Sequence, residues 1–392
     1  MMAAKYDIHF CLISVQAAAN LLPILDPQFK PKKAVFLVSN KMKEQAKFLK
    51  NTVEKLGVNV VLENLADIFE FAELEDRIAD IVSQYESEDI ALNVTGGTKL
   101  MAIAAQNVFS MADKPIFYMD TDKNRIVFVS QSAEKKRMAD IHLSTKITME
   151  NYLMAYGHSV VSEQKLAVNE SELDLVKEFI HYYDRYRNLI PQLNGIASRS
   201  ENSGYKTALE HKELKQNGLT DFLFELHDEE IIAFDGERVN FKNKATKEKL
   251  NGGWLEEVVF SELKNINKVQ DISLNLEVGN TNYNPNKSTW DEKNKGNKNE
   301  FDVVFIANNK LHIVECKTAI MQSKKSADKP ESILYKLEAL KDYGGLMTKK
   351  CLVSYFELNE ADRNRAKELK IEVIHGKELQ QLKSKIQNWI GK

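Results

Sequence analysis

Short apolar runs alternate with amphipathic stretches along the first third of the chain. Between the runs, stretches such as 41–56 place apolar residues at the three- and four-residue spacing of a helix. Strands that are apolar on both faces are typical of a parallel sheet covered by helices. Residues 1–145 are therefore predicted to form one α/β domain. The strand-like runs are residues 7–13, 34–38, 59–62, 90–94 and 116–119.

The last part of the chain, residues 246–392, has a different order of predicted elements. An Asn308-Asn309 pair between two apolar strands favours a hairpin with a type I′ turn, since asparagine tolerates positive φ. This part is predicted to be a second α/β domain built around that hairpin. The other predicted elements are a helix over 254–264, a strand over 272–278, a helix over 332–340 and a strand over 352–355.

Residues 146–245 are predicted to be a connector made of helices and a hairpin. A long amphipathic helix is predicted over 174–189, and Asp235-Gly236 is a two-residue turn between apolar flanks. Aromatic and basic side chains mix on that helix. Packing between domains is the commoner explanation of such a mixture, and contact with nucleic acid or a partner subunit is the alternative. These residues are Tyr182, Tyr183, Arg185, Tyr186 and Arg187.

Composition narrows the class of protein. At 392 residues the chain is long enough for two domains. No apolar run approaches the roughly 18 residues that span a bilayer, so no membrane contact is expected. The cysteines Cys11, Cys316 and Cys351 are far apart and have no zinc-ligand spacing. This usage favours the reducing cytoplasm over a disulfide-forming compartment.

Charge is distributed unevenly along the chain. The formal net charge of −3 argues against a protein that coats nucleic acid without specificity. Residues 281–350 nevertheless contain 13 lysines against 9 acidic residues. A basic region in an acidic chain is a modest indication of a phosphate-bearing substrate, and a solvated lysine-rich surface explains it equally well.

The most informative segment of the first domain is the turn after the strand over 90–94. Its glycines let the backbone bring N–H groups near a ligand, and the N-terminus of the next helix adds partial positive charge. The segment is neither GxGxxG nor a Walker loop, so it predicts an anion or phosphate cradle. An ordinary glycine turn capped by threonine is the alternative. Its residues are Thr95, Gly96, Gly97, Thr98 and Lys99.

Polar residues also follow the first two strands of the predicted sheet. Ser14 and Gln16 come after the first strand, and Ser39 and Asn40 come after the second. In an open α/β sheet, the carboxyl ends of the parallel strands border one crevice where ligands bind. Each residue alone is more often a helix cap. Together they are predicted to line the same ligand site as the glycine turn.

The candidate chemistry lies on the predicted hairpin of the second domain. Folding the chain about Asn308-Asn309 places Asp302 directly opposite Glu315. Because side chains alternate along a strand, Lys317 then shares a face with both acids. The other face is predicted to carry the apolar side chains Phe301, Val303, Val314 and Cys316.

Two carboxylates opposite each other on a ladder repel and destabilise the sheet. A divalent cation between them would reverse that effect, and hard carboxylate oxygens suit Mg²⁺ or Mn²⁺. Lys317 would then face a phosphate or the attacking water. The pattern predicts metal-assisted phosphodiester hydrolysis. The alternative, a surface hairpin with exposed charges, is disfavoured by the apolar neighbours.

Asp302 with Glu315-Cys316-Lys317 further along resembles the motif of the PD-(D/E)XK nucleases. The resemblance implies a restriction-endonuclease-like α/β domain with a further acid on its first helix. Glu256 is the candidate for that acid, with Glu257 as second choice. By this resemblance Asp302, Glu315 and Glu256 bind the metal and Lys317 acts in catalysis. Phe301 stands where the motif name has proline, at a position that varies in the family.

The first domain in turn resembles the CARF domain, the CRISPR-associated Rossmann fold, with residues 95–99 at its ligand-binding turn. CARF followed by PD-(D/E)XK is similar to the ancillary nucleases of type III CRISPR systems. The resemblance implies a homodimer, activation by cyclic tetra-adenylate, and cleavage of DNA, RNA or both. Two alternatives stay open: a restriction or repair nuclease that no cyclic nucleotide controls, and a nucleotide-responsive regulator without catalysis.

Overall fold

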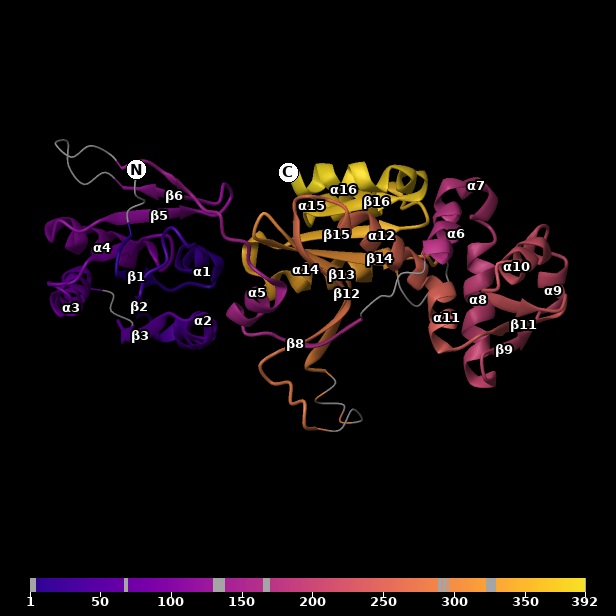
Figure 1. Cartoon of the computed structure of the whole chain (residues 1–392), viewed down its shortest axis with the longest axis horizontal. Coiled ribbons are helices and arrows are strands. Elements are labelled where there is room, and N and C mark those ends of the chain that lie inside the picture. Colours follow the sequence, from indigo (N-terminus) through magenta and orange to yellow (C-terminus); the bar gives the residue numbers. More distant parts are fainter. Residues whose placement is uncertain are drawn as a thin grey trace.

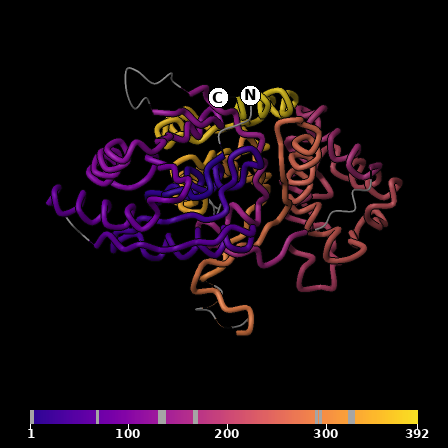
Figure 2. Tube along the Cα trace, turned by 60° about the vertical axis from the view of Figure 1, so that its left-hand side comes forward, coloured from indigo at the N-terminus to yellow at the C-terminus, as the bar shows by residue number. Residues whose placement is uncertain are grey.

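The computed structural model describes residues 5–391, apart from 67–69, 130–137, 165–169, 288–290, 292–293, 295 and 322–328. Three sheets follow one another along the molecule: seven strands at the N-terminal end, six in the middle and three at the far end (Figure 1). The described part of residues 280–297 projects away from the middle sheet in both Figure 1 and Figure 2. Within the described ranges, no helix combines the length and the apolar character needed to cross a membrane.

The seven-stranded sheet has the order β3-β2-β1-β4-β5-β6-β7, and strands β1 to β5 are parallel. Helices α1 (Ala18–Leu25) and α2 (Lys43–Lys55) cover one face, and α3 (Phe71–Ser83) and α4 (Lys99–Met111) cover the other. The predicted parallel α/β domain is confirmed. Its strands are β1 (Ile8–Leu12), β2 (Lys33–Val38), β3 (Asn59–Asn64), β4 (Ile90–Asn93), β5 (Ile116–Asp120), β6 (Arg125–Phe128) and β7 (Ile141–His142).

The six-stranded sheet has the order β16-β15-β14-β13-β12-β8, and the predicted second α/β domain is confirmed. Helices α12 (Trp254–Lys264) and α16 (Leu382–Gly391) cover one face, and α14 (Pro330–Ala339), with α15 (Glu360–Glu368) beside it, covers the other. β8 lies in the stretch that the sequence assigns to the connector, yet it pairs with β12 as the edge strand. The strands are β8 (Ser159–Gln164), β12 (Val269–Gly279), β13 (Lys298–Ala307), β14 (Lys310–Lys317), β15 (Lys349–Ser354) and β16 (Ile371–His375).

The β13–β14 hairpin turns at Asn308 and Asn309, whose φ angles of 51° and 57° confirm the type I′ turn. The paired residues follow the predicted register as far as Val303 opposite Val314. Beyond that pair the backbone ladder gives way to a side-chain bond, since the Cys316 N–H donates to Asp302 Oδ2 at 2.7 Å.

The prediction that Phe301 shares a face with Val303 is wrong. Val303, Val314 and Cys316 pack in the core beneath α12, whereas Phe301 packs in the core beneath α14. Its ring meets Tyr343 edge to face, with 5.0 Å between the ring centroids. Strict alternation therefore fails next to Asp302, where the regular ladder ends.

The connector folds against the second domain. The single helix predicted over 174–189 is wrong, because Tyr182 has a ψ of 45° and separates two helices. The hairpin at Asp235-Gly236 is confirmed by the antiparallel pairing of β10 and β11. One core joins these elements to Trp254 on α12. The elements are α6 (Glu170–His181), α7 (Tyr183–Tyr186), α8 (Ile190–Ser200), β9 (Lys206–Ala208), α9 (His211–Leu214), α10 (Leu219–Asp228), β10 (Ile232–Phe234), β11 (Arg238–Phe241) and α11 (Lys244–Glu248).

The tip of the β13–β14 hairpin joins the two large domains. Asn309 is 4% exposed, and its Oδ1 accepts from the Ile147 N–H at 3.1 Å and from Gln270 Nε2 at 2.8 Å. Its Nδ2 donates to Asn124 Oδ1 at 3.2 Å and to the Thr145 carbonyl at 3.0 Å. All four hydrogen-bonding positions of this amide are thus used at the junction.

Replacing Asn309 should therefore loosen the junction. Asn309→Gly keeps the positive φ but leaves buried partners without their bonds, so we expect a loss of at least about 2 kcal/mol of stability. Asn308→Gly is the matched control, because the Asn308 side chain makes one long bond, 3.4 Å from Nδ2 to the Ile390 carbonyl. Chemical denaturation measures both variants, and equal losses would contradict this account of Asn309.

Candidate functional site

A cavity of about 960 Å³ lies at the end of the β13–β14 hairpin that is remote from the turn. Asp302, Glu315, Lys317 and Glu256 all line it, so the structure brings the four predicted residues together. Lys317 Nζ lies 2.8 Å from Glu315 Oε1 and 4.0 Å from Asp302 Oδ2. The Glu315 side chain is 4% exposed, which places its charge in a largely desolvated position.

Burial and mutual repulsion dominate the electrostatics of this cavity. Burial, followed by the charge of Asp302, raises the pKa of Glu256 to about 8. Burial and the charge of Glu315 raise the pKa of Asp302 to about 6, although Lys317 opposes the rise. Burial acts to lower the pKa of Lys317, but Glu315 and Asp302 outweigh it and raise that pKa, so the ammonium keeps its charge. The cavity thus brings acidic groups close together, and Lys317 and the Cys316 N–H partly offset their repulsion.

The two candidate acids on α12, Glu256 and Glu257, both line the cavity but have different partners. Glu256 interacts electrostatically with Asp302, whereas Glu257 Oε2 is bound to Lys249 Nζ at 2.9 Å. A sharp turn before the helix sets this arrangement. Gly252 has a φ of 127°, and a β-carbon there would lie 2.6 Å from Thr318 Oγ1. The helix then begins at the buried Trp254, which orients the face that carries Glu256.

Residues outside the predicted set complete the cavity. Lys336 on α14 places its Nζ 3.7 Å from Glu315 Oε1. Asn194 on α8 also lines the wall, and its Nδ2 donates to the Thr318 carbonyl and to Thr318 Oγ1, both at 3.2 Å. No local pattern marks Asn194, because its partner is 124 residues away.

The carboxylates of the cavity are of the kind that a divalent cation prefers. Asp302, Glu315 and Glu256 offer hard oxygen ligands, and burial and mutual repulsion, which a cation would offset, raise the pKa values of Asp302 and Glu256. In the described part of the chain, no three His, Cys, Asp or Glu side chains are close enough to form a ready-made metal site. The charge and the oxygen ligands of these residues fit Mg²⁺ or Mn²⁺, although their present spacing does not form a finished site. Lys317 lies between two of the carboxylates, Asp302 and Glu315.

The glycine turn of the first domain closes tightly against the end of β1. A β-carbon at Gly96 would lie 2.0 Å from the Leu12 carbonyl oxygen and 3.4 Å from Ser14 Oγ, so only glycine fits. Gly97 has a φ of 72°, and Thr98 caps α4 by accepting from the Met101 N–H. The Thr95 hydroxyl already has two partners within the domain, since it donates to Asn93 Oδ1 and accepts from the Met119 N–H.

The other predicted ligand residues lie at the same edge of the sheet. Ser14 and Gln16 follow β1, which lies between β2 and β4 in the sheet, and Ser39 and Asn40 follow β2. Gln16 differs from the rest. Its buried Nε2 has no hydrogen-bond partner among the described residues, and it would lie 2.9 Å from a β-carbon at Gly345 of the second domain. Gln16 therefore contacts the neighbouring domain.

The first domain has a glycine turn at the carboxyl edge of its sheet, and the second has a cavity lined by acids and a lysine. This combination is typical of a nuclease joined to a ligand-binding domain. The family model of the Card1 CARF domain matches residues 8–152. The family model of the Card1-like endonuclease domain matches residues 243–392. The chain therefore carries a CARF domain of the Card1 kind, followed by a Card1-like endonuclease domain.

Solved structures share this fold over nearly the whole chain. Protein VC1899 from Vibrio cholerae has a TM-score of 0.84 at 23% identity and covers 98% of both chains. Can2 from Sulfobacillus thermosulfidooxidans, in complex with cyclic tetra-adenylate, has a TM-score of 0.79 at 24% identity over 99% of this chain and 98% of its own. A type III CRISPR defence DNA nuclease activated by cyclic oligoadenylate has a TM-score of 0.54 at 16% identity over 90% of this chain and 46% of its own. No curated protein matches the sequence significantly.

The raised pKa values predict a pH-dependent stability in EDTA. The folded protein holds protons on Glu256 and Asp302 up to pH values of about 8 and about 6, whereas the ordinary values are 4.5 and 3.8. The folded state thus binds more protons than the unfolded state in this window, and the free energy of unfolding should fall as pH rises through it.

Glu256→Gln should flatten the fall in thermal midpoint between about pH 6 and about pH 8. Glu262→Gln on the same helix is the control, because its carboxylate pairs with Lys177 at 3.4 Å outside the cavity. Thermal unfolding across this pH range measures both variants. An unchanged slope in Glu256→Gln would show that Glu256 does not titrate in the cavity.

Proposed function

We propose that the chain is a metal-dependent nuclease of PD-(D/E)XK type that cyclic tetra-adenylate activates. The observation that carries the proposal is the convergence of Asp302, Glu315, Glu256 and Lys317 on one cavity. Such a cluster of acids costs stability, so its retention favours catalysis over a silent regulator. The substrate would be the phosphodiester backbone of DNA, RNA or both.

The cavity residues divide into two roles. Asp302, Glu315 and Glu256 would hold Mg²⁺ or Mn²⁺, which supplies charge neutralisation and an activated water. Lys317 cannot bind a cation, because an ammonium only donates. Its charge is instead available to the scissile phosphate, with Lys336 as a second positive group.

The activator would bind at the carboxyl edge of the first sheet. The tight turn at Gly96 presents backbone N–H groups and the N-terminus of α4, while Lys99 and Ser14 stand on either side. The likeness to Can2, whose structure was solved in complex with cyclic tetra-adenylate, supports this ligand as the activator. The match to a CARF domain also disfavours a restriction or repair nuclease in which the first domain is a mere scaffold.

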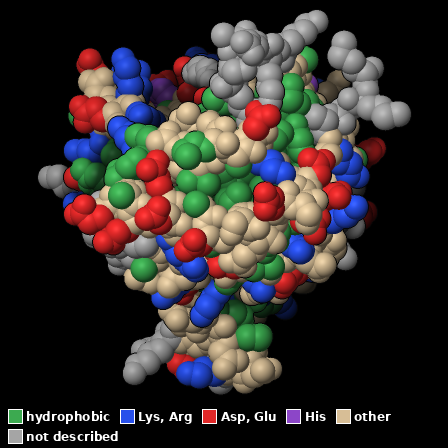
Figure 3. Space-filling view, turned by 90° about the vertical axis from the view of Figure 1, so that its left-hand side faces the viewer, with side chains coloured by type: hydrophobic (Ala, Val, Ile, Leu, Met, Phe, Trp, Pro, Cys, Tyr) green, Lys and Arg blue, Asp and Glu red, His purple; other side chains and the backbone are tan. Residues whose placement is uncertain are grey.

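A ring with two-fold symmetry requires two copies of the cradle, so we propose a homodimer. Exposed apolar side chains on α4 support it, with Ile103 50% and Met111 89% exposed. Apolar surface gathers near the middle of this end of the molecule, with charged side chains around it (Figure 3). The three cysteines are buried and form no disulfide with one another, which agrees with the cytoplasm as the proposed location.

Glu315→Gln and Lys317→Ala should separate metal binding from catalysis. Both should lower cleavage at least about 100-fold. Glu315→Gln should also weaken Mn²⁺ binding in a calorimetric titration, because it removes a ligand, whereas Lys317→Ala should not. Near-normal cleavage by Glu315→Gln in Mn²⁺ would show that the cavity is not the active site.

Lys99→Ala should raise the concentration of cyclic tetra-adenylate needed for half-maximal cleavage. A lysine at a helix N-terminus attracts ring phosphates, and full switching takes a preference of roughly 5 kcal/mol for the active state. Lys47→Ala, at an exposed position within α2, is the control. The readouts are cleavage against activator concentration and the mass of the species in light scattering. Full cleavage without activator, or an active monomer, would contradict the switch.

A further inference from the structure

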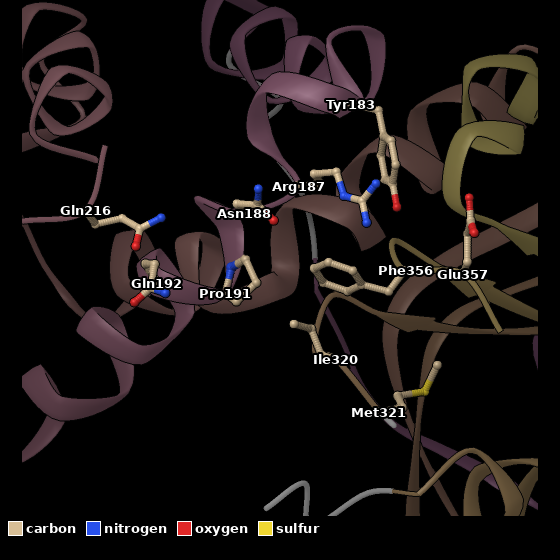
Figure 4. Close-up of a pocket in the computed structure, with 10 residues that line it drawn as sticks. All are labelled: Tyr183, Arg187, Asn188, Pro191, Gln192, Gln216, Ile320, Met321, Phe356 and Glu357. Carbon is tan, nitrogen blue, oxygen red and sulfur yellow. The ribbon is translucent and has the colours of Figure 1, made fainter. Parts of the chain in front are cut away.

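A second cavity, of about 480 Å³, lies beside the carboxylate cavity, and Figure 4 shows the residues that line it. Two segments border both. Residues 317–319 line the carboxylate cavity and Ile320 and Met321 line the second one. On α8, Pro191 and Gln192 face the second cavity, and Asn194 faces the first. From Lys317 to Ile320 the chain can span at most ~11 Å, so the two cavities are close neighbours.

The walls of this second cavity combine an aromatic face, amides and one cation. Phe356 is partly exposed on one wall, and Asn188, Gln192 and Gln216 stand on the opposite side (Figure 4). Arg187 lies beside Tyr183 (Figure 4), with its guanidinium carbon 5.8 Å from the centroid of the Tyr183 ring. Glu357 lies at the rim beyond Phe356.

The aromatic and basic residues within 182–187, which the sequence analysis described as a mixture, have different surroundings in the structure. Tyr183 and Tyr186 are buried in the core of the second domain, so packing accounts for them. Arg185 is bound to Glu225 on α10. Arg187 is exposed and also lines the cavity, whereas the exposed Tyr182 is not part of the lining.

We propose that this cavity binds a nucleobase of a single-stranded substrate, next to the nucleotide whose phosphate lies at Glu315 and Lys317. Phe356 would stack on the base, the amides would bond its edge, and Arg187 would contact an adjoining phosphate. A paired base has its faces covered and cannot enter such a pocket, whereas an unstacked base can. The proposal rests on the nuclease function proposed above.

The test measures binding in EDTA, so it does not depend on cleavage. The probes are a fluorescent single-stranded DNA oligonucleotide and a matching strand in which every base is replaced by an abasic site. Phe356→Leu should weaken binding of the intact strand by about tenfold and leave the abasic strand unchanged. Phe356→Tyr should restore binding, since it keeps the ring. Phe224→Leu, at an exposed aromatic on α10, is the control.

Arg187→Ala should weaken binding of both strands alike and lower the salt dependence of binding by about one phosphate contact. Arg185→Ala, two residues away, should change neither. The proposal is overturned if Phe356→Leu binds the intact strand as the wild type does, or loses affinity for both strands equally. Wild-type protein that binds the intact strand through Phe356 but cleaves nothing with activator and Mn²⁺ would instead overturn the nuclease function.

Discussion

The hydrogen bonds of Asn309 fix the β13–β14 hairpin to the first domain, and the position of the acidic cavity depends on them. The Asn309 amide joins Asn124, Thr145, Ile147 and Gln270 in a buried junction. Glu315 lies six residues after Asn309 on the same hairpin, which corresponds to about 20 Å in an extended strand. Because the strand is central in its sheet, a displacement at the tip moves the carboxylates with it.

A second physical connection joins the ligand edge of the first domain to the same carboxylate. Gln16, two residues after Ser14, packs against Gly345. The adjacent Gly344 carbonyl accepts from Tyr152 Oη at 3.0 Å on α5 (Met149–Ala155), which lies between the domains. Residues 344–345 follow α14, whose Lys336 reaches Glu315. One apolar core runs continuously from α1 and α2 to α14, so these contacts belong to a packed interface between the domains.

Local signals in the sequence predicted much of this architecture. The apolar pattern on both sides of Asn308-Asn309 determines the hairpin register, and the Thr98 cap and the glycine turn determine where α4 begins. What failed depends on contacts distant in sequence. The break at Tyr182 follows from burying Tyr183 and Tyr186 in a core shared with α12, and the cavity wall at Asn194 follows from its bond to Thr318. Alternation misplaced Phe301 because the ladder ends beside Asp302, where a carboxylate replaces a backbone acceptor.

The lysines around Glu315 explain how a cluster of acids can persist in a folded domain and still serve chemistry. Lys317 and Lys336 both lie against Glu315, and Lys317 also offsets Asp302. The Lys317 ammonium thus offsets the charge of both carboxylates and hydrogen-bonds Glu315. In the proposed nuclease a substrate phosphate would compete for this ammonium, and drawing Lys317 toward the phosphate would free carboxylate oxygens. Lys336 lies on α14 and Glu315 lies on the β13–β14 hairpin. Because the hairpin and the segment after α14 both contact the first domain, the first domain influences the distance between the Lys336 and Glu315 charges. Control of the cavity by the first domain therefore requires no large rearrangement, because a shift of about an ångström between buried charges changes their interaction substantially in a medium of low polarity.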